Sequence, residues 1–177
     1  CELSLCSNDD TGTGGSKGDP HLTFAHGGKA DFRGKNDTIY ALLSTGNLTV
    51  GARTMDTDFT LGHKLVHGSF FVDCFITTRT SNGRMLHIHI DSGRSGFSAH
   101  LSDTKKLTDY RDKLWKDVWY DEQTRVFSRH ATTMIRTKGW EVNCTIKPIY
   151  NWISGPRKSR LDFTLRPLDG VKTSINH

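Results

Sequence analysis

Histidine, cysteine and carboxylate side chains carry out most protein chemistry, and this chain of 177 residues holds nine histidines, four cysteines and 19 aspartates and glutamates. His87 and His89 lie two positions apart in an alternating segment, which places both on one face of a strand at a spacing that zinc sites use. A zinc site needs a third ligand, for which His67, His100 and Asp91 are the candidates. We favour a solvent-facing histidine pair, with a metal-dependent hydrolase as the less favoured alternative.

No motif for nucleophilic or acid–base catalysis is found in the sequence. A Gly-x-Ser-x-Gly elbow is missing, no two cysteines have the two-residue spacing of a redox or zinc pair, and nothing marks two carboxylates as a glycosidase pair. We therefore expect a protein that is not an enzyme and that has no cofactor.

Cys74 and Cys144 lie in two segments, 70–76 and 140–146, in which apolar and polar side chains alternate. Alternation places each cysteine on the inward face of a strand. Two inward cysteines on separate strands predict a disulfide, with buried free thiols as the alternative. For Cys1 and Cys6 there are two alternatives. They form a disulfide with each other, which we slightly favour, or each bonds a cysteine outside this chain. The other residues expected on the inward faces are Phe70, Val72, Ile76, Trp140, Val142 and Ile146.

Three Asn-x-Thr sequons begin at Asn36, Asn47 and Asn143. The first two fall at expected turns, and Asn143 points outward if its neighbour Cys144 points inward. Accessible sequons together with inward cysteines favour a secreted, extracellular glycoprotein, with glycans on at least two of the three sites.

The formal net charge is +5 and the sequence pI is about 9.1, which permits attraction to polyanions. Lysines and aspartates interleave between residues 103 and 117, however, so we favour a mixed surface over a dedicated polyanion site. We expect extracellular protein modules or glycans as partners, self-assembly included, and neither nucleic acid nor membrane insertion. A mean hydropathy of −0.53 and the lack of a long apolar run support the last point.

Most of the chain after residue 18 alternates at the period of a strand. Clear cases are 86–90 and 161–165, and Ile39, Ala41 and Leu43 are expected on one face. Gly-bearing turns separate the segments, so we predict a mainly β fold, an antiparallel sandwich or barrel of short strands. The exception is 103–119, where apolar residues recur at helical spacing and predict one helix.

The most distinctive motif begins with Gly18-Asp19-Pro20-His21 and Phe24 and continues through Phe32, Gly34 and Tyr40. This ordered series resembles the opening of von Willebrand factor type D domains. The resemblance is sharp over residues 18–43, and is strongest to divergent type D-like domains of protist and plant extracellular proteins.

Composition indicates a Cys-containing segment and Gly/Ser-rich linker over 1–17, and the resemblance implies a type D-like β domain over 18–177. The family's terminal Cys-Gly-x-Asn loop is missing, so we expect this domain to be truncated at its C-terminal end, with a different ending in this branch as the alternative. The implied function is that of a structural, adhesion or assembly module of a larger extracellular matrix or filament protein. The alternative is a module that binds polyanions or glycans through a basic surface.

The chain also departs from the family pattern. His26 stands where the family has a calcium-binding Asp, and the terminal Cys-Gly-x-Asn loop is missing from residues 1–177, so we expect no family-type calcium site. In some relatives the Gly-Asp-Pro-His motif is cleaved spontaneously at mildly acidic pH. The Asp19-Pro20 bond is therefore a candidate for acid-labile cleavage.

Overall fold

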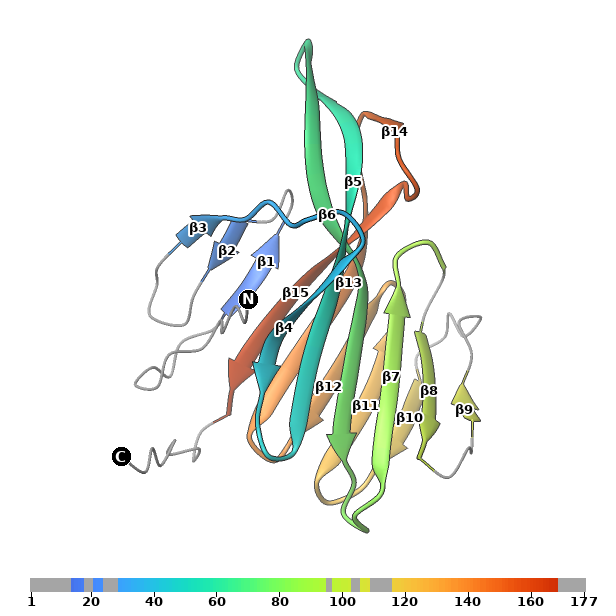
Figure 1. Ribbon diagram of the computed structural model, residues 1–177. Coiled ribbons are helices and arrows are strands. Elements are labelled where there is room, and N and C mark those ends of the chain that lie inside the picture. The colour runs from blue at the N-terminus through green and yellow to red at the C-terminus, as the bar shows by residue number, and fades with distance from the viewer. Residues whose placement is uncertain are drawn as a thin grey trace, which may run out of the picture.

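Two antiparallel sheets packed face to face form the protein (Figure 1). The computed structural model describes residues 14–17, 21–23, 29–94, 97–102, 106–108 and 116–168. The eight-stranded sheet has the order β10-β11-β12-β13-β15-β1-β2-β3, and the seven-stranded sheet has the order β14-β5-β6-β7-β8-β9, with β4 paired to β5. The predicted sandwich is thus confirmed, and the sheets do not close into the barrel that was the alternative.

The strands of the eight-stranded sheet are β1 (Gly14–Lys17), β2 (His21–Thr23), β3 (Lys29–Asp31), β10 (Lys116–Tyr120), β11 (Thr124–Arg129), β12 (Thr132–Thr137), β13 (Trp140–Pro148) and β15 (Ser159–Pro167). Those of the seven-stranded sheet are β4 (Thr38–Ser44), β5 (Leu48–Leu61), β6 (Lys64–Arg79), β7 (Met85–Asp91), β8 (Phe97–Leu101), β9 (Lys106–Thr108) and β14 (Trp152–Ser154). In the described parts of the chain, no helix is long and apolar enough to cross a membrane.

The helix expected over 103–119 is wrong wherever the structure describes this segment. Residues 106–108 form β9 and pair with β8, and 116–120 form β10 and pair with β11. Residues 103–105 and 109–115 lie outside the described residues. Pairing with a neighbouring strand has overridden the local helical spacing, as tertiary context commonly does.

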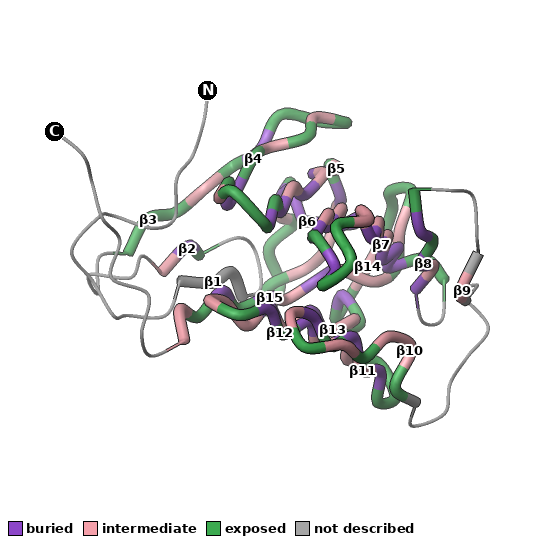
Figure 2. Tube along the Cα trace, turned by 90° about the horizontal axis from the view of Figure 1, so that it is seen from below, coloured by how far each residue is buried: buried purple, intermediate pink, exposed green. Residues whose placement is uncertain are grey.

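The core lies between the two sheets, where Figure 2 shows the buried positions gathered. Leu86, Ile88 and Ile90 are buried as the alternation predicts, and so is the inner face of β15. From the two sheets, Phe71 and Phe163 meet with ring centroids 5.1 Å apart.

Two irregularities in the strands shift the predicted inward faces. A register shift between Ala41 and Leu43 leaves Ile39 exposed, so the predicted face of Ile39, Ala41 and Leu43 is wrong. A second shift, opposite Arg53 and Thr54, turns Phe71 into the core instead of Phe70. A bulge adds one residue to a strand, and one residue is enough to exchange the two faces.

Strands β5 and β6 are much longer than their neighbours. Beyond the second register shift they leave the sandwich as a hairpin that projects from one end of the molecule, with β14 beside β5 (Figure 1). Gly62, at a φ of 63°, occupies the turn, a backbone conformation that favours glycine. We call residues 55–70 together with β14 the arm.

Candidate functional site

The arm presents apolar side chains to the outside. Leu61 is 71% exposed, Leu65 55% and Ile153 of β14 49%. Phe59, which pairs with Val66 and Trp152, lies deeper and contacts Phe70 at a ring-centroid distance of 5.4 Å. Leu65 pairs with Thr60, so Leu61 and Leu65 lie on opposite faces of the hairpin and both faces of its tip carry an exposed apolar side chain.

Part of one edge of the arm has no partner strand among the residues that the structure describes. Strand β6 pairs with β7 only from Asp73 to Arg79, and the Ser92 N–H donates to the Val72 carbonyl at 2.8 Å. Residues 68–72 are buried, so the accessible stretch that no described strand pairs with on the side opposite β5 is 64–67. An unpaired edge presents backbone N–H and C=O groups that another strand can use. Lys64 and His67 are the only charged or titratable side chains on this stretch of β6.

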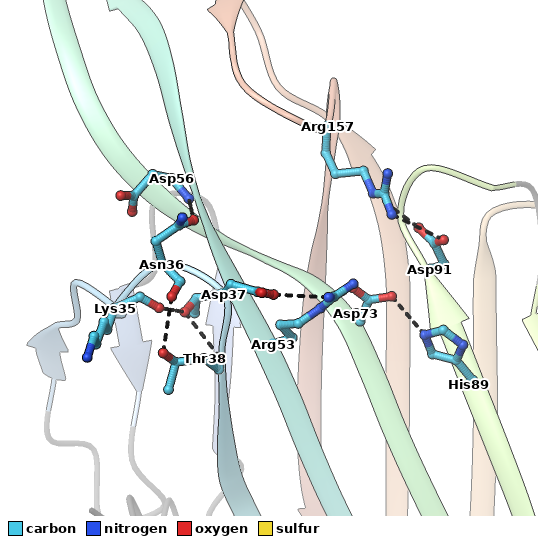
Figure 3. A network of polar contacts seen from close by, with 11 residues as sticks. Lys35, Asn36, Asp37, Thr38, Arg53, Asp56, Asp73, His89, Asp91 and Arg157 are labelled. Carbon is cyan, nitrogen blue, oxygen red and sulfur yellow. Dashed lines mark hydrogen bonds and ion pairs between the residues drawn. The ribbon is translucent and has the colours of Figure 1, made fainter.

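The base of the arm is held by residues 34–38, which lie across β5 and β6 (Figure 3). The Gly34 N–H donates to Ser69 Oγ at 2.9 Å, and Thr54 Oγ1 donates to the Lys35 carbonyl at 2.7 Å. A Cβ on Gly34 would stand 2.5 Å from the Thr54 side chain. This motif glycine is therefore required by a close approach of backbone to side chain.

A row of alternating charges crosses the outer face of the seven-stranded sheet at the same level (Figure 3). Arg53 Nη1 donates to Asp37 Oδ1 at 3.0 Å, and its Nε and Nη2 donate to Asp73 Oδ2 at 2.9 and 2.6 Å. Asp73 Oδ1 lies 2.7 Å from His89 Nε2. The turn residue Asp37 and three strand residues, Arg53, Asp73 and His89, are thus joined at the point where the arm leaves the sandwich.

Asp73 is the centre of this row and is fully buried. Burial raises the pKa of its carboxyl, but hydrogen bonds from His89 and Arg53 outweigh that effect and the pKa of Asp73 is lowered. The hydrogen bond to Asp73 raises the pKa of Arg53 in return. Asp73 is therefore a carboxylate at neutral pH.

The opposite side of the arm is fixed through the loop after β14. Arg157 Nη2 lies 3.5 Å from Asp91 Oδ2, at the end of β7 (Figure 3), and Gly155, at a φ of 128°, brings the loop against Thr57. Both sides of the base are anchored, so the arm has a defined direction.

Ser154, Asp58 and His67 contain the residue types of a catalytic triad but not its arrangement. The Ser154 hydroxyl donates to Asp58 Oδ2 at 2.7 Å, and Asp58 Oδ1 lies 2.6 Å from His67 Nδ1. The hydrogen bond from Ser154 lowers the pKa of Asp58. In a triad the histidine contacts the serine; here the aspartate lies between them and joins β14, β5 and β6.

The histidines proposed as metal ligands have separate partners. His87 lies 3.1 Å from Thr77 Oγ1 and stacks on His100 at 5.2 Å, whereas His89 contacts Asp73. The other two candidates are elsewhere, Asp91 beside Arg157 and His67 on the arm. Within the described residues, no three or more His, Cys, Asp or Glu side chains lie together in a way that could hold a metal.

Cys74 and Cys144 are fully buried and face each other from β6 and β13. The contact with the Cys74 thiol, together with burial, raises the pKa of the Cys144 thiol. The structure holds both as free thiols, so the disulfide stays a prediction. Cys1 and Cys6 lie outside the described residues.

The three sequons stay candidates for glycosylation. Asn36 and Asn47 are exposed, and the half-buried Asn143 side chain lies on the outer face of β13, where it donates to Glu141 Oε1 at 3.2 Å. The outward position expected for Asn143 is confirmed.

Only part of the type D-like motif can be placed. Gly18, Asp19, Pro20, Phe24 and His26 lie outside the described residues, and with them the candidate Asp19-Pro20 cleavage site. The remaining motif residues are structural: Phe32 contacts Tyr40 at 4.9 Å and Phe71 at 5.7 Å, and His21 Nδ1 lies 2.6 Å from Asp31 Oδ1.

Sequence reasoning missed the arm and the charged row. A signal for the arm exists in the apolar runs on both sides of Gly62-His63, which read as one long hairpin. Nothing local marks Asp73 for burial, because its partners Arg53 and His89 come from two other strands.

Comparisons with protein-family models, curated proteins and solved structures find no match. The resemblance to type D domains therefore stays a prediction, and the argument for function rests on the geometry.

Proposed function

We propose that this chain is a structural module of a larger extracellular matrix or filament protein, and that it assembles with a second copy of itself through the arm. The observation that carries the proposal is a projecting, anchored hairpin with exposed apolar side chains and an unpaired strand edge. Its glycosylation and extracellular location, and its resemblance to type D modules, are parts of the same proposal.

A second copy suits this edge because the backbone hydrogen-bonding groups of two identical antiparallel strand edges are complementary. Two identical β6 edges can pair antiparallel about a two-fold axis, which satisfies the backbone groups of both. Such pairing extends the sheet from one copy into the next and brings exposed Leu65 side chains of both copies near the axis. Because the base of the arm is anchored, little conformational freedom is lost on association.

The test is the mass of the chain in solution by analytical ultracentrifugation over a range of concentrations. We expect concentration-dependent dimers or larger assemblies for the wild type. The double variant Leu61→Asp, Leu65→Asp should stay monomeric, because association would bury two added charges.

The matched control is Tyr120→Asp, which adds a charge in place of an exposed aromatic on β10, 75% exposed and outside the arm. It should associate like the wild type. A wild type that is monomeric at every concentration, or a control that dissociates as fully as the arm variant, contradicts the proposal.

A further inference from the structure

A cleft opens at the end of the sandwich opposite the arm, between the turns that join strands of both sheets (the lower end in Figure 1). Its volume is about 680 Å³, within the range of small-molecule sites. The turns come from β4–β5, β6–β7, β10–β11 and β12–β13, so the two sheets form opposite walls. The lining residues are Thr45, Gly46, Asn47, Leu48, Thr78, Arg79, Gln123, Thr137, Lys138, Gly139 and Trp140.

The charged residues of the lining are both cations. Arg79 comes from the end of β6 and Lys138 from the β12–β13 turn of the other sheet, and no carboxylate is among the lining residues. Arg79 uses Nη1 for a bond of 3.3 Å to the Gly83 carbonyl, which leaves other guanidinium donors available. Opposed cations in a concave site favour an anionic ligand.

Other polar side chains of the same cleft are also available. In the described part of the chain, no hydrogen bond is found for the side chains of Asn47, Gln123 or Lys138. The half-buried Trp140 adds an aromatic ring to the lining. Amides, an aromatic ring and cations together are suited to a sugar that bears acidic groups, because the ring packs on its C–H face and the amides bond its hydroxyls.

The walls of the cleft are held in place before any ligand binds. Asp121 accepts hydrogen bonds from the backbone N–H of Ser81, Gln123 and Thr124, at 3.0, 2.8 and 2.7 Å, and so ties the β10–β11 turn to the β6–β7 turn. The Arg79 N–H donates to the Asn47 carbonyl at 3.1 Å. A preformed site loses less freedom on binding than a mobile one.

From these observations we infer that the cleft binds a short acidic oligosaccharide. Arg79 and Lys138 bind its carboxylate or sulfate groups, Trp140 packs against a sugar ring, and Asn47 and Gln123 bond its hydroxyls. This activity goes beyond the assembly role and uses the other end of the molecule, so either of these two proposals can fail without the other. It requires Asn47 without a glycan, so that Asn36 and Asn143 are the two glycosylated sequons.

The experiment is isothermal titration calorimetry of the full chain, produced without N-glycans so that Asn47 is unmodified. The probes are a hexamer of galacturonic acid and, as the neutral counterpart, maltohexaose. We expect binding of the acidic hexamer only, with an affinity that falls as salt rises. Arg79→Gln and Lys138→Gln should each weaken it about tenfold, the usual cost of one charge-assisted hydrogen bond.

Three controls make the result decisive. Lys147→Gln removes the same charge from the outer face of β13 and should leave the affinity unchanged. Trp140→Phe should keep binding, and Trp140→Leu should weaken it. The arm variant Leu61→Asp, Leu65→Asp should bind like the wild type. Absence of binding at low salt, equal binding of maltohexaose, or an equal loss for Lys147→Gln overturns the inference.

Discussion

At the scale of single residues, Asp73 is the most consequential polar side chain in the described structure. It is buried, and Arg53 and His89 bond its two oxygens from neighbouring strands. A buried charge is tolerated only when paired and hydrogen-bonded, and removal of one partner leaves the others uncompensated.

We predict that Asp73→Asn lowers the free energy of unfolding at neutral pH by about 2 kcal/mol, less than for a fully buried pair because Arg53 and His89 are partly exposed. The pKa of Asp73 is lower in the folded chain than in the unfolded chain. Its contribution is therefore present above the unfolded pKa and is lost as the pH falls through the folded pKa. Urea unfolding at pH 7 and at successively lower pH measures both effects.

The matched control for Asp73 is Asp117→Asn, which removes an aspartate from an exposed pair with Arg125. It should change stability little at any pH, because solvent and salt screen such a pair. A gap between wild type and Asp73→Asn that persists undiminished in acid would show that packing, and not the charge, is responsible.

At the scale of elements, strands in which apolar and polar residues alternate regularly are predicted well from the sequence. Segments 86–90 and 161–165 alternate without interruption, and both are strands with the predicted inward faces. Near residues 42 and 72 a bulge shifts the pattern, and the extra residue has no sequence signature of its own. Segment 106–120 misleads for another reason: its strands depend on partners elsewhere in the chain.

The candidate sites were less accessible to sequence reasoning than the fold. The spacing of His87 and His89 correctly places both side chains outward, but their bonds go to Thr77 and Asp73, which spacing cannot reveal. The cleft at the far end combines four turns from both sheets, and only the three-dimensional arrangement brings Arg79 and Lys138 to one site.

Gly34 shows how the segment over residues 34–38 controls the arm. We predict that Gly34→Ala destabilises the chain by about 1–3 kcal/mol, because the new Cβ would meet Thr54 at 2.5 Å and one of the two must move. The displaced segment would loosen the base of the arm, so assembly should weaken as well. Thermal unfolding and ultracentrifugation measure the two effects.

Gly46→Ala is the control for this close approach, since a Cβ there meets nothing within 4 Å. It should be neutral in both measurements. If the two alanine variants behave alike, the segment over 34–38 adapts freely and does not anchor the arm.

At the scale of the whole molecule, what holds the two sheets together is their shared apolar core, and Cys74 and Cys144 lie within it in direct contact. A bond between them would close a loop of roughly 70 residues across the sandwich and would stabilise the fold by on the order of 4 kcal/mol in the chain-entropy account. The disulfide would then cross-link the two sheets that form the walls of the cleft.

We predict that this disulfide forms during folding rather than afterwards. The raised pKa of the Cys144 thiol keeps the thiolate scarce in the folded chain, and burial excludes the disulfide reagent that must accept the two electrons and two protons. Refolding in glutathione disulfide should therefore give the bond quickly, whereas the reduced, folded chain should resist the same reagent. Non-reducing peptide mapping at timed intervals distinguishes the two. The variant Cys74→Ala, Cys144→Ala should match the reduced wild type to within the cost of the small cavities and fall below the oxidised one. Alkylation of both thiols after oxidative refolding would contradict the prediction.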